Sequence, residues 1–141
     1  MKRTLSLFCI LAALILMALP FGIQMHFVSD PGPPMEFVTF HFSYLSLMPL
    51  GYANWMPLIT VLLSLAILFM IVFGNKKDRG MRKDRKIPIC ICLIVCIAAS
   101  FVSWSVFSTL TIIGAVVFAL HFALLTIQLL NFEQTKSDAG K

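Results

Sequence analysis

The chain has 141 residues, of which 60% are hydrophobic and 12% are charged, and its formal net charge is +5. Soluble domains are about 45–50% apolar and about 25% charged, so too few polar positions are present here to cover a soluble core. No charged residue occurs in three long runs, residues 5–23, 55–73 and 87–132. Because a membrane-spanning helix needs roughly 20 apolar residues, the third run is long enough for two spans.

The first run predicts a helix over residues 5–23. Lys2 and Arg3 precede it, as basic residues precede the apolar core of a secretory signal. A signal has an apolar core of about 7–15 residues and a small-residue cleavage site, whereas this run is longer and no such site follows. We therefore expect an uncleaved first membrane span.

The segment 24–54 contains two runs that alternate between polar and apolar residues, on either side of the turn sequence SDPGPP. This pattern predicts a β-hairpin with strands at about 23–28 and 35–44. Pairing Val28 with Met35 separates the side chains by polarity. One face then carries Gln24, His26, Thr39, His41 and Ser43, and the other carries Met25, Phe27, Val38, Phe40 and Phe42. We expect the apolar face to lie on the helix ends as a lid.

His26 and His41 are weak candidates for a functional site on this outer segment. Imidazole and thioether groups suit copper, and imidazole suits zinc. In the register above, His41 lies four residues from the partner of His26, which is roughly 13 Å and too far for one ion. A metal-binding role remains an alternative that requires another register, and we otherwise expect no metal and no cofactor.

The second run predicts a span over residues 55–73, followed by a basic loop at 74–86. The loop carries seven positive residues, and Gly74 and Asn75 are candidates to end the helix. Basic residues at this position contact anionic lipid headgroups at about 1 kcal/mol each, so we favour a topology signal over a nucleic-acid site. The residues expected at the headgroups are Lys76, Lys77, Arg79, Arg82, Lys83, Arg85 and Lys86.

The third run predicts two antiparallel spans at about 87–107 and 110–132. Small residues recur every four positions in both, which allows membrane helices to approach closely. In an antiparallel pair, Ser100 would meet Ala115 and Cys96 would meet Ala119. The series are Cys92, Cys96 and Ser100 in one helix, and Thr111, Ala115, Ala119 and Ala123 in the other.

His121 lies near the middle of the fourth predicted span and is the main candidate for a functional or packing polar residue. An ionisable residue within a membrane span is a functional hypothesis by default. Its stripe, with Gly114 and Gln128, points away from the small-residue series. We expect an uncharged ring that touches either Thr60 or Ser64 of the second span, or a second protomer.

The distribution of charge predicts the orientation. All 11 Lys and Arg residues lie before residue 4, within 76–86 or after residue 135, which places them on one side of a four-span bundle. The positive-inside rule makes that side cytoplasmic. Trp and Tyr residues gather at the opposite, outer boundary, as interfacial aromatic residues do. We expect one four-helix domain over residues 1–141 in the cell membrane, with both termini in the cytoplasm.

These patterns favour a small non-enzymatic membrane protein that binds a membrane protein partner or forms a homo-oligomer. No phosphate-binding loop, nucleophile elbow or metalloprotease motif occurs in the sequence. The alternative is a small transporter or channel subunit that uses His121. A third hypothesis is a metal-binding protein outside the cytoplasm. The sequence indicates the lipid bilayer as a partner and no nucleic acid.

Overall fold

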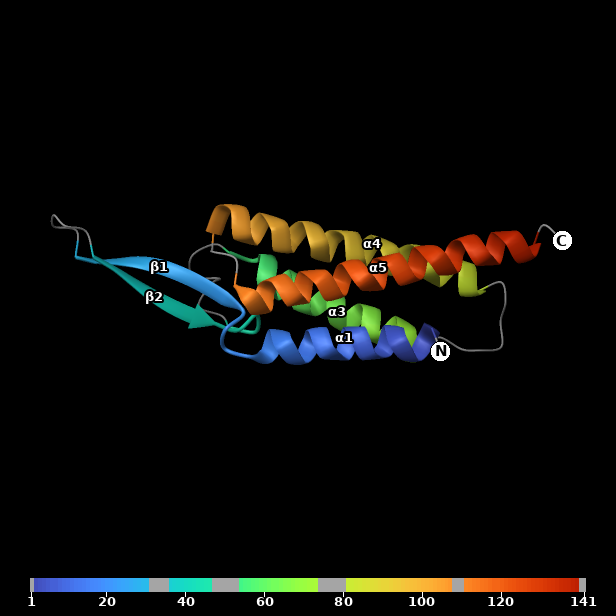
Figure 1. The fold of residues 1–141 in the computed structure, drawn as a ribbon, viewed down its shortest axis with the longest axis horizontal. Helices are drawn as coiled ribbons and strands as arrows, with labels where there is room; N and C mark the ends of the chain where they lie inside the picture. Colours follow the sequence, from blue (N-terminus) through green and yellow to red (C-terminus); the bar gives the residue numbers. More distant parts are fainter. Residues whose placement is uncertain (1, 31–35, 47–53, 74–80, 108–110, 140–141) are drawn as a thin grey trace.

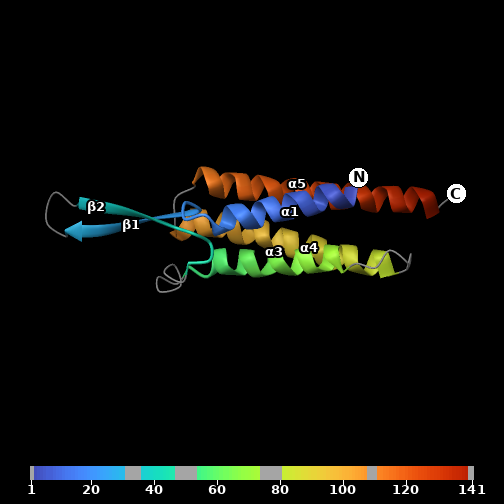
Figure 2. The ribbon, with the colours of Figure 1, turned by 90° about the horizontal axis from the view of Figure 1, so that it is seen from below.

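The computed structural model describes residues 2–30, 36–46, 54–73, 81–107 and 111–139 of the chain (Figure 1). This part contains four α-helices, one π-helical turn and a two-stranded antiparallel sheet. The helices form an elongated bundle, and the sheet projects from one end of it (Figure 2). The start of the first helix and the last helical turns of the chain lie at the opposite end.

The bundle is a closed ring of four helices. Helix α1 (Lys2–Ala18) packs between α3 (Met56–Val72) and α5 (Ile112–Ala139), and α4 (Met81–Val102) completes the ring between α3 and α5. A π-helical turn, η1 (Ser103–Phe107), extends α4 at the end nearest the sheet. Four helices were expected, and the described part of the chain confirms them.

The helix ends differ from the expected ones. Helix α1 ends at Ala18 instead of residue 23, because Pro20 follows and the first strand begins at Ile23. Helix α4 begins at Met81, so residues 81–86 of the expected basic loop are helical. Residues 74–80, which include the expected helix end at Gly74 and Asn75, lie outside the described part.

Two helical segments are long and apolar enough to cross a membrane, Lys86–Ser105 and Ile112–Leu130. Two further apolar helical segments are shorter, Arg3–Ala18 and Met56–Val72. At 1.5 Å per residue, a 17-residue helix such as α3 spans about 26 Å, somewhat less than a hydrocarbon core of about 30 Å.

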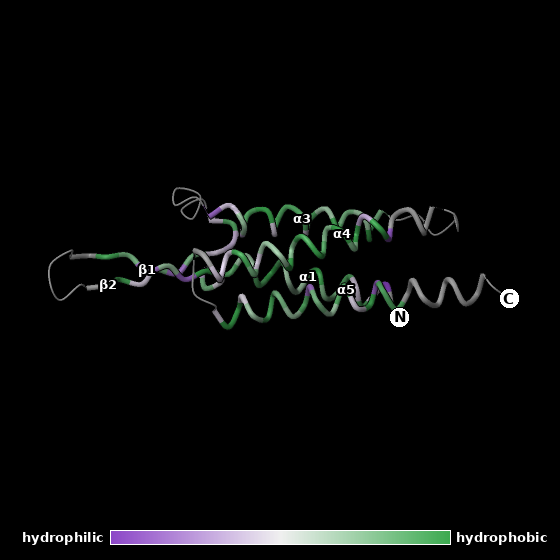
Figure 3. The backbone as a smooth tube through the Cα atoms, turned by 90° about the horizontal axis from the view of Figure 1, so that it is seen from above, coloured by the Kyte–Doolittle hydropathy of each residue, from purple (hydrophilic) through white to green (hydrophobic). Residues whose placement is uncertain are grey.

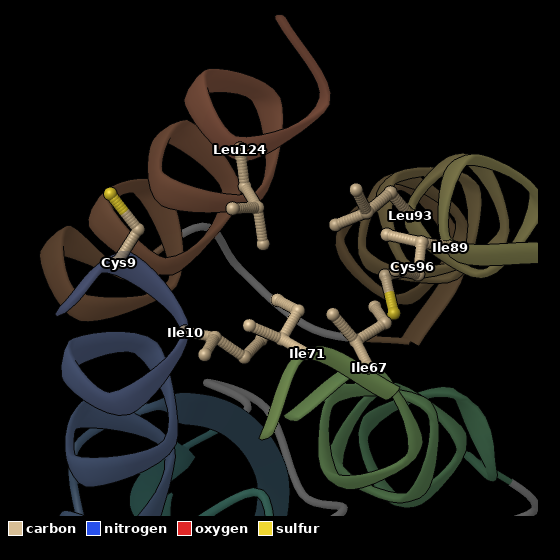
Figure 4. Packing of buried hydrophobic residues seen from close by; sticks show 8 residues of the cluster. All are labelled: Cys9, Ile10, Ile67, Ile71, Ile89, Leu93, Cys96 and Leu124. Carbon is tan, nitrogen blue, oxygen red and sulfur yellow. The ribbon is translucent and has the colours of Figure 1, made fainter. Parts of the chain in front are cut away.

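An apolar layer fills the middle of the bundle (Figure 4). Ile10, Ile67, Leu93 and Leu124 come from the four different helices and are at most 1% exposed. They point into the space between the helices, next to the buried thiol of Cys96. The helices are apolar along most of their described length (Figure 3), and many of their large apolar side chains are exposed on the outside of the bundle. The apolar surface therefore surrounds the bundle as well as filling it.

The sheet is the hairpin that the alternation predicted, with a different register. Strand β1 (Ile23–Asp30) pairs antiparallel with β2 (Glu36–Phe42). Val28 pairs with Phe37, whereas Met35 was the expected partner. A shift of two residues keeps every side chain on its expected face, because side chains alternate with a period of two.

The hairpin does not cover the helix ends as a lid, so that prediction is wrong. It extends away from the bundle along the long axis (Figures 1 and 2). Only its base is buried, where Ile23, Met25 and Tyr44 pack with Met17 and Val117 of the helices. Farther out, apolar side chains are exposed on both faces of the strands: Val28, Phe37, Val38 and Phe40.

The expected contact between the small-residue series of α4 and α5 is also wrong. Ala119 and Ala123 are exposed on the outside of the bundle. The inward face of α5 is the other stripe, formed by buried Gly114, Val117, His121, Leu124 and Gln128. The larger side chains of this stripe fill the interior of the bundle, while the small side chains of Ala119 and Ala123 lie on its outer surface.

Candidate functional site

His121 lies on the inward face of α5 and is 1% exposed. Its Nδ1 is 2.9 Å from the carbonyl oxygen of Val117 on the same helix, and its Nε2 is 2.9 Å from Ser64 Oγ of α3. Ser64 was one of the two partners expected from the sequence. Of the two alternatives, contact within the chain is therefore the one observed.

The Ser64 hydroxyl is shared among several groups. It lies 2.7 Å from the Thr60 carbonyl oxygen, to which it can donate a hydrogen bond, as well as contacting His121 Nε2. The Cys96 thiol of α4 donates to the same Thr60 carbonyl oxygen, with its Sγ at 3.8 Å. Groups from three helices thus meet at Ser64 and the Thr60 carbonyl oxygen, and the Ser64 hydroxyl has a single proton to donate.

Further buried polar side chains lie on both sides of this cluster along the bundle, toward the hairpin and toward the opposite end. Toward the hairpin, Asn54 Nδ2 donates to Ser103 Oγ at 3.2 Å, and Ser100 is buried one turn before Ser103 in α4. Within the described part of the chain, the Asn54 Oδ1 and Ser100 Oγ atoms have no hydrogen-bond partner. Toward the opposite end, Gln128 Nε2 donates to Ser6 Oγ at 3.3 Å.

The apolar layer described above separates these two polar regions. Gln128 lies seven residues beyond His121 on α5, which corresponds to about 10 Å along the helix. Leu124 lies between them and packs with Ile10, Ile67 and Leu93. Asn54, Ser103, Ser100 and His121 are thus buried polar side chains on the hairpin side of the apolar layer, and Gln128 and Ser6 lie on the other side.

A tight junction connects the hairpin base to the bundle. Thr111 Oγ1 donates to the Gly22 carbonyl oxygen at 2.8 Å and accepts from the Gly114 amide at 2.9 Å. Tyr44 was expected at a lipid interface but is 2% exposed, and its ring lies against Gly22. Burial raises the pKa of Tyr44 to about 12, while a hydrogen bond with Trp104 acts in the opposite direction.

His26 and His41 lie on the same exposed face of the hairpin. His26 Nδ1 is 2.9 Å from Thr39 Oγ1, and the His41 ring contacts the Phe21 ring edge-on at 6.0 Å between centroids. Thr39 is the partner of His26, so His41 is a diagonal neighbour of His26 instead of lying four residues away. Diagonal neighbours are about 7–8 Å apart, which corrects the expected separation of roughly 13 Å. Within the described ranges, no group of three His, Cys, Asp or Glu side chains could hold a metal.

Of the seven basic residues expected at lipid headgroups, the structure places one side chain. Lys86 is 8% exposed at the start of the apolar part of α4. Lys76, Lys77 and Arg79 lie outside the described part, and nothing further is described of the remaining three side chains. Arg3 also lies at this end, and its Nη2 donates to the carbonyl oxygens of Ile71 and Val72 at 3.0 and 2.8 Å.

Sequence reasoning missed the contacts of Arg3, Asn54 and Gly22. Each joins segments that are far apart in the chain, and no local pattern marks such a pair. Asn54 carried one usable signal, because it is a polar residue directly before an apolar run.

The chain matches no protein-family model, no curated protein and no solved structure in these comparisons.

Proposed function

We propose that this chain is a non-enzymatic, multi-pass protein of the cell membrane that binds another protein through its outer hairpin. All four helices cross the bilayer in this proposal, with both termini in the cytoplasm and the hairpin outside. The exposed aromatic surface of the hairpin is the observation that carries the binding function. The outward apolar faces of the helices support the membrane location.

The surface of the bundle suits lipid on every helix. Phe8, Phe69, Phe101 and Phe122 come from the four helices and are 57–69% exposed. Hydroxyl groups on the outside are bonded within their own helices, as in Thr126 Oγ1, which donates to the Phe122 carbonyl oxygen at 3.0 Å. Such side chains need no water, which suits a hydrocarbon environment.

The hairpin differs, because its apolar side chains would lie beyond the bilayer. An isolated two-stranded hairpin is marginally stable in water unless something covers its apolar face. Phe37 and Phe40 are 62% and 49% exposed, and the Phe40 ring contacts those of Phe27 and Phe42 in the same hairpin. The two rings lie on opposite faces of the strands, so a partner on the outer side of the membrane would bury both by enclosing the hairpin with apolar surface.

The orientation can be tested by cysteine labelling in intact cells. A membrane-impermeant maleimide should label a Phe37→Cys variant in intact cells, and a Lys136→Cys variant only after permeabilisation. The four native cysteines lie within the apolar helices, so the unsubstituted chain provides the background. Labelling of Lys136→Cys in intact cells would contradict the orientation.

Partner binding can be tested by placing a photo-crosslinking amino acid at position 40. We expect a crosslinked protein whose yield falls when Phe37 is replaced by Ser, because both rings belong to the exposed hairpin. The same crosslinker at position 122, on the outside of α5, is the matched control and should label lipid. A product made only of two copies of this chain would identify a homo-oligomer. Labelling of lipid alone at position 40 would refute the proposal.

Transport is a second candidate function, which the buried polar side chains favour. Intramembrane polar groups mark the paths of many transporters. His121 and Ser64 lie in the bundle interior on the hairpin side of the apolar layer. Uptake of candidate solutes into proteoliposomes, lost in a His121→Ala variant, would support this function. Equal uptake by both proteins would contradict a role for His121.

A further inference from the structure

His121 faces two groups that place different demands on its ring. The Val117 carbonyl oxygen can only accept a hydrogen bond, so Nδ1 must carry a proton to bond with it at 2.9 Å. In the neutral ring, Nε2 is then an acceptor and needs the hydroxyl proton of Ser64. That same proton is the one that the Thr60 carbonyl oxygen, 2.7 Å away, can also accept.

The neutral ring therefore leaves one of these two short contacts without a proton. If the Ser64 hydroxyl donates to Nε2, it cannot donate to the Thr60 carbonyl oxygen. If Nε2 is protonated as well, it donates to Ser64 Oγ, and the hydroxyl is free to donate to Thr60. The heavy atoms already occupy positions that satisfy the doubly protonated ring completely.

We propose that His121 and Ser64 form a proton-binding site inside the bundle, in which the Ser64 hydroxyl changes its acceptor when the ring is protonated. A proton from hydronium in the outer solution forms an N–H bond at Nε2. The Ser64 O–H bond stays intact and rotates from Nε2 to the Thr60 carbonyl oxygen. The positive charge remains on the imidazolium, which donates to Val117 and Ser64.

The groups that face the ring are uncharged hydrogen-bonding groups. Helix α3 contributes the hydroxyl groups of Thr60 and Ser64, and α4 contributes the Cys96 thiol. Cys9 of α1 belongs to the apolar layer at Leu124. Arg3 and Lys86 lie at the far end of the bundle, and residues 87–132 contain no Asp or Glu. No carboxylate of this span therefore competes for the proton.

The position of the site suggests the side from which the proton arrives. Asn54, Ser103 and Ser100 continue the polar interior toward the hairpin, whereas the apolar layer closes the cytoplasmic side. The direction of proton entry rests on the orientation proposed above. The proton-binding site itself does not depend on whether the hairpin binds a partner.

Nitrogen-15 NMR of the histidine ring tests the proposal. His26 and His41 are exposed, so a His26→Gln/His41→Gln double variant leaves His121 as the single histidine of the chain. In detergent micelles at pH 8, we expect a neutral ring with its proton on Nδ1. On acidification to pH 4.5, the ring should become protonated at both nitrogens. A ring that stays neutral at pH 4.5, or that carries its proton on Nε2 at pH 8, would overturn the proposal.

Substitutions at Ser64 separate a proton-binding site from a histidine that only packs. Ser64→Ala removes the acceptor of the Nε2 proton, and bonds to a charged donor are stronger than neutral ones. The ratio of protonated to neutral ring at the same pH should therefore fall roughly tenfold. Ser64→Thr keeps the hydroxyl and should restore the ratio. Ser100→Ala, the matched control, removes a buried hydroxyl that has no partner among the described residues and should leave the ratio unchanged. Should Ser64→Ala fail to fold, the titration of the double variant decides alone.

Discussion

The helix bundle and the outer hairpin both expose large apolar side chains, but their settings differ. On the bundle these side chains cover all four helices, and buried polar side chains such as His121 and Gln128 bond with other helices. On the hairpin, large apolar side chains are exposed on both faces of a thin sheet that extends beyond the helices, and one of these faces also carries polar side chains. In the proposed function, lipid covers the first surface and a partner protein covers the second. Exposed phenylalanine rings on the bundle and on the hairpin are therefore proposed to contact different molecules.

An arginine substituted into each surface gives the largest expected difference. Phe122→Arg places a charge on the outside of α5, which costs about 2.5–3.5 kcal/mol even on the lenient insertion scale. We expect this variant to be lost from the membrane fraction after carbonate extraction. Phe37→Arg changes a ring of similar exposure on the hairpin and should leave the chain in the membrane. Equal loss of the two variants would contradict the distinction between the surfaces.

Alkaline pH should act on the junction between the two regions. The pKa of Tyr44 is about 12 in the folded chain against 10.0 for a free tyrosine, because burial disfavours the phenolate. Between these values the unfolded chain loses its proton first, so the free energy of unfolding falls as pH rises from 10 toward 12. The full loss is about 3 kcal/mol. Tyr44→Phe should remove this part of the loss.

The measurement is unfolding in mixed micelles at pH 9 and pH 11.5, together with phenolate absorbance near 295 nm. The chain has two tyrosines, so the Tyr44→Phe variant reports the other alone. A phenolate that forms at the same pH in both proteins would show that Tyr44 is not buried.

Much of the difference between the bundle and the hairpin could be predicted from the sequence, because it depends on the periodicity of apolar residues. The alternation predicted the hairpin and the partition of its faces, and the charge-free runs predicted the four helices. The register was wrong by two residues, since that shift leaves every side chain on the same face and the pattern is blind to it. The prediction that the hairpin lies on the helix ends was wrong for a related reason. The apolar face of a strand pattern does not specify which part of the molecule, or which other molecule, packs against it.

The interior of the bundle was harder to predict. Small residues every four positions in α5 suggested a helix contact, yet Ala119 and Ala123 face outward. Size alone does not determine which face of an apolar helix is inside. The prediction for His121 was more accurate, because a polar group in an apolar helix needs a polar partner and the second predicted span offered Thr60 and Ser64.

Gly22→Ala should weaken the junction by steric overlap. A Cβ at this position would lie 2.7 Å from Cδ2 of Tyr44, whose ring is buried and bonded to Trp104. Overpacking of this kind costs about 1–3 kcal/mol. Gly114→Ala is a comparison at the same junction, because a Cβ there would lie 3.1 Å from Thr111 Oγ1 and 3.2 Å from Trp104 Nε1, while alanine favours a helix interior. Unfolding in mixed micelles should show a larger loss for Gly22→Ala, where the overlap is more severe, than for Gly114→Ala. A larger loss for Gly114→Ala would contradict the packing described.

Arg3→Gln should give the smallest effect, at the end of the bundle farthest from the hairpin. The guanidinium donates to two carbonyl oxygens at the end of α3, where the last carbonyls of a helix lack partners within it. Because the contact is partly open to solvent, we expect a loss of about 1 kcal/mol in unfolding. Lys2→Gln removes the same charge one residue earlier and separates charge from hydrogen bonding. If both variants lose the same stability, the charge near the end of α3 matters and the two hydrogen bonds do not. Crosslinking at position 40 should be unchanged in Arg3→Gln, because the bundle transmits no strain to a hairpin that touches it only at its base.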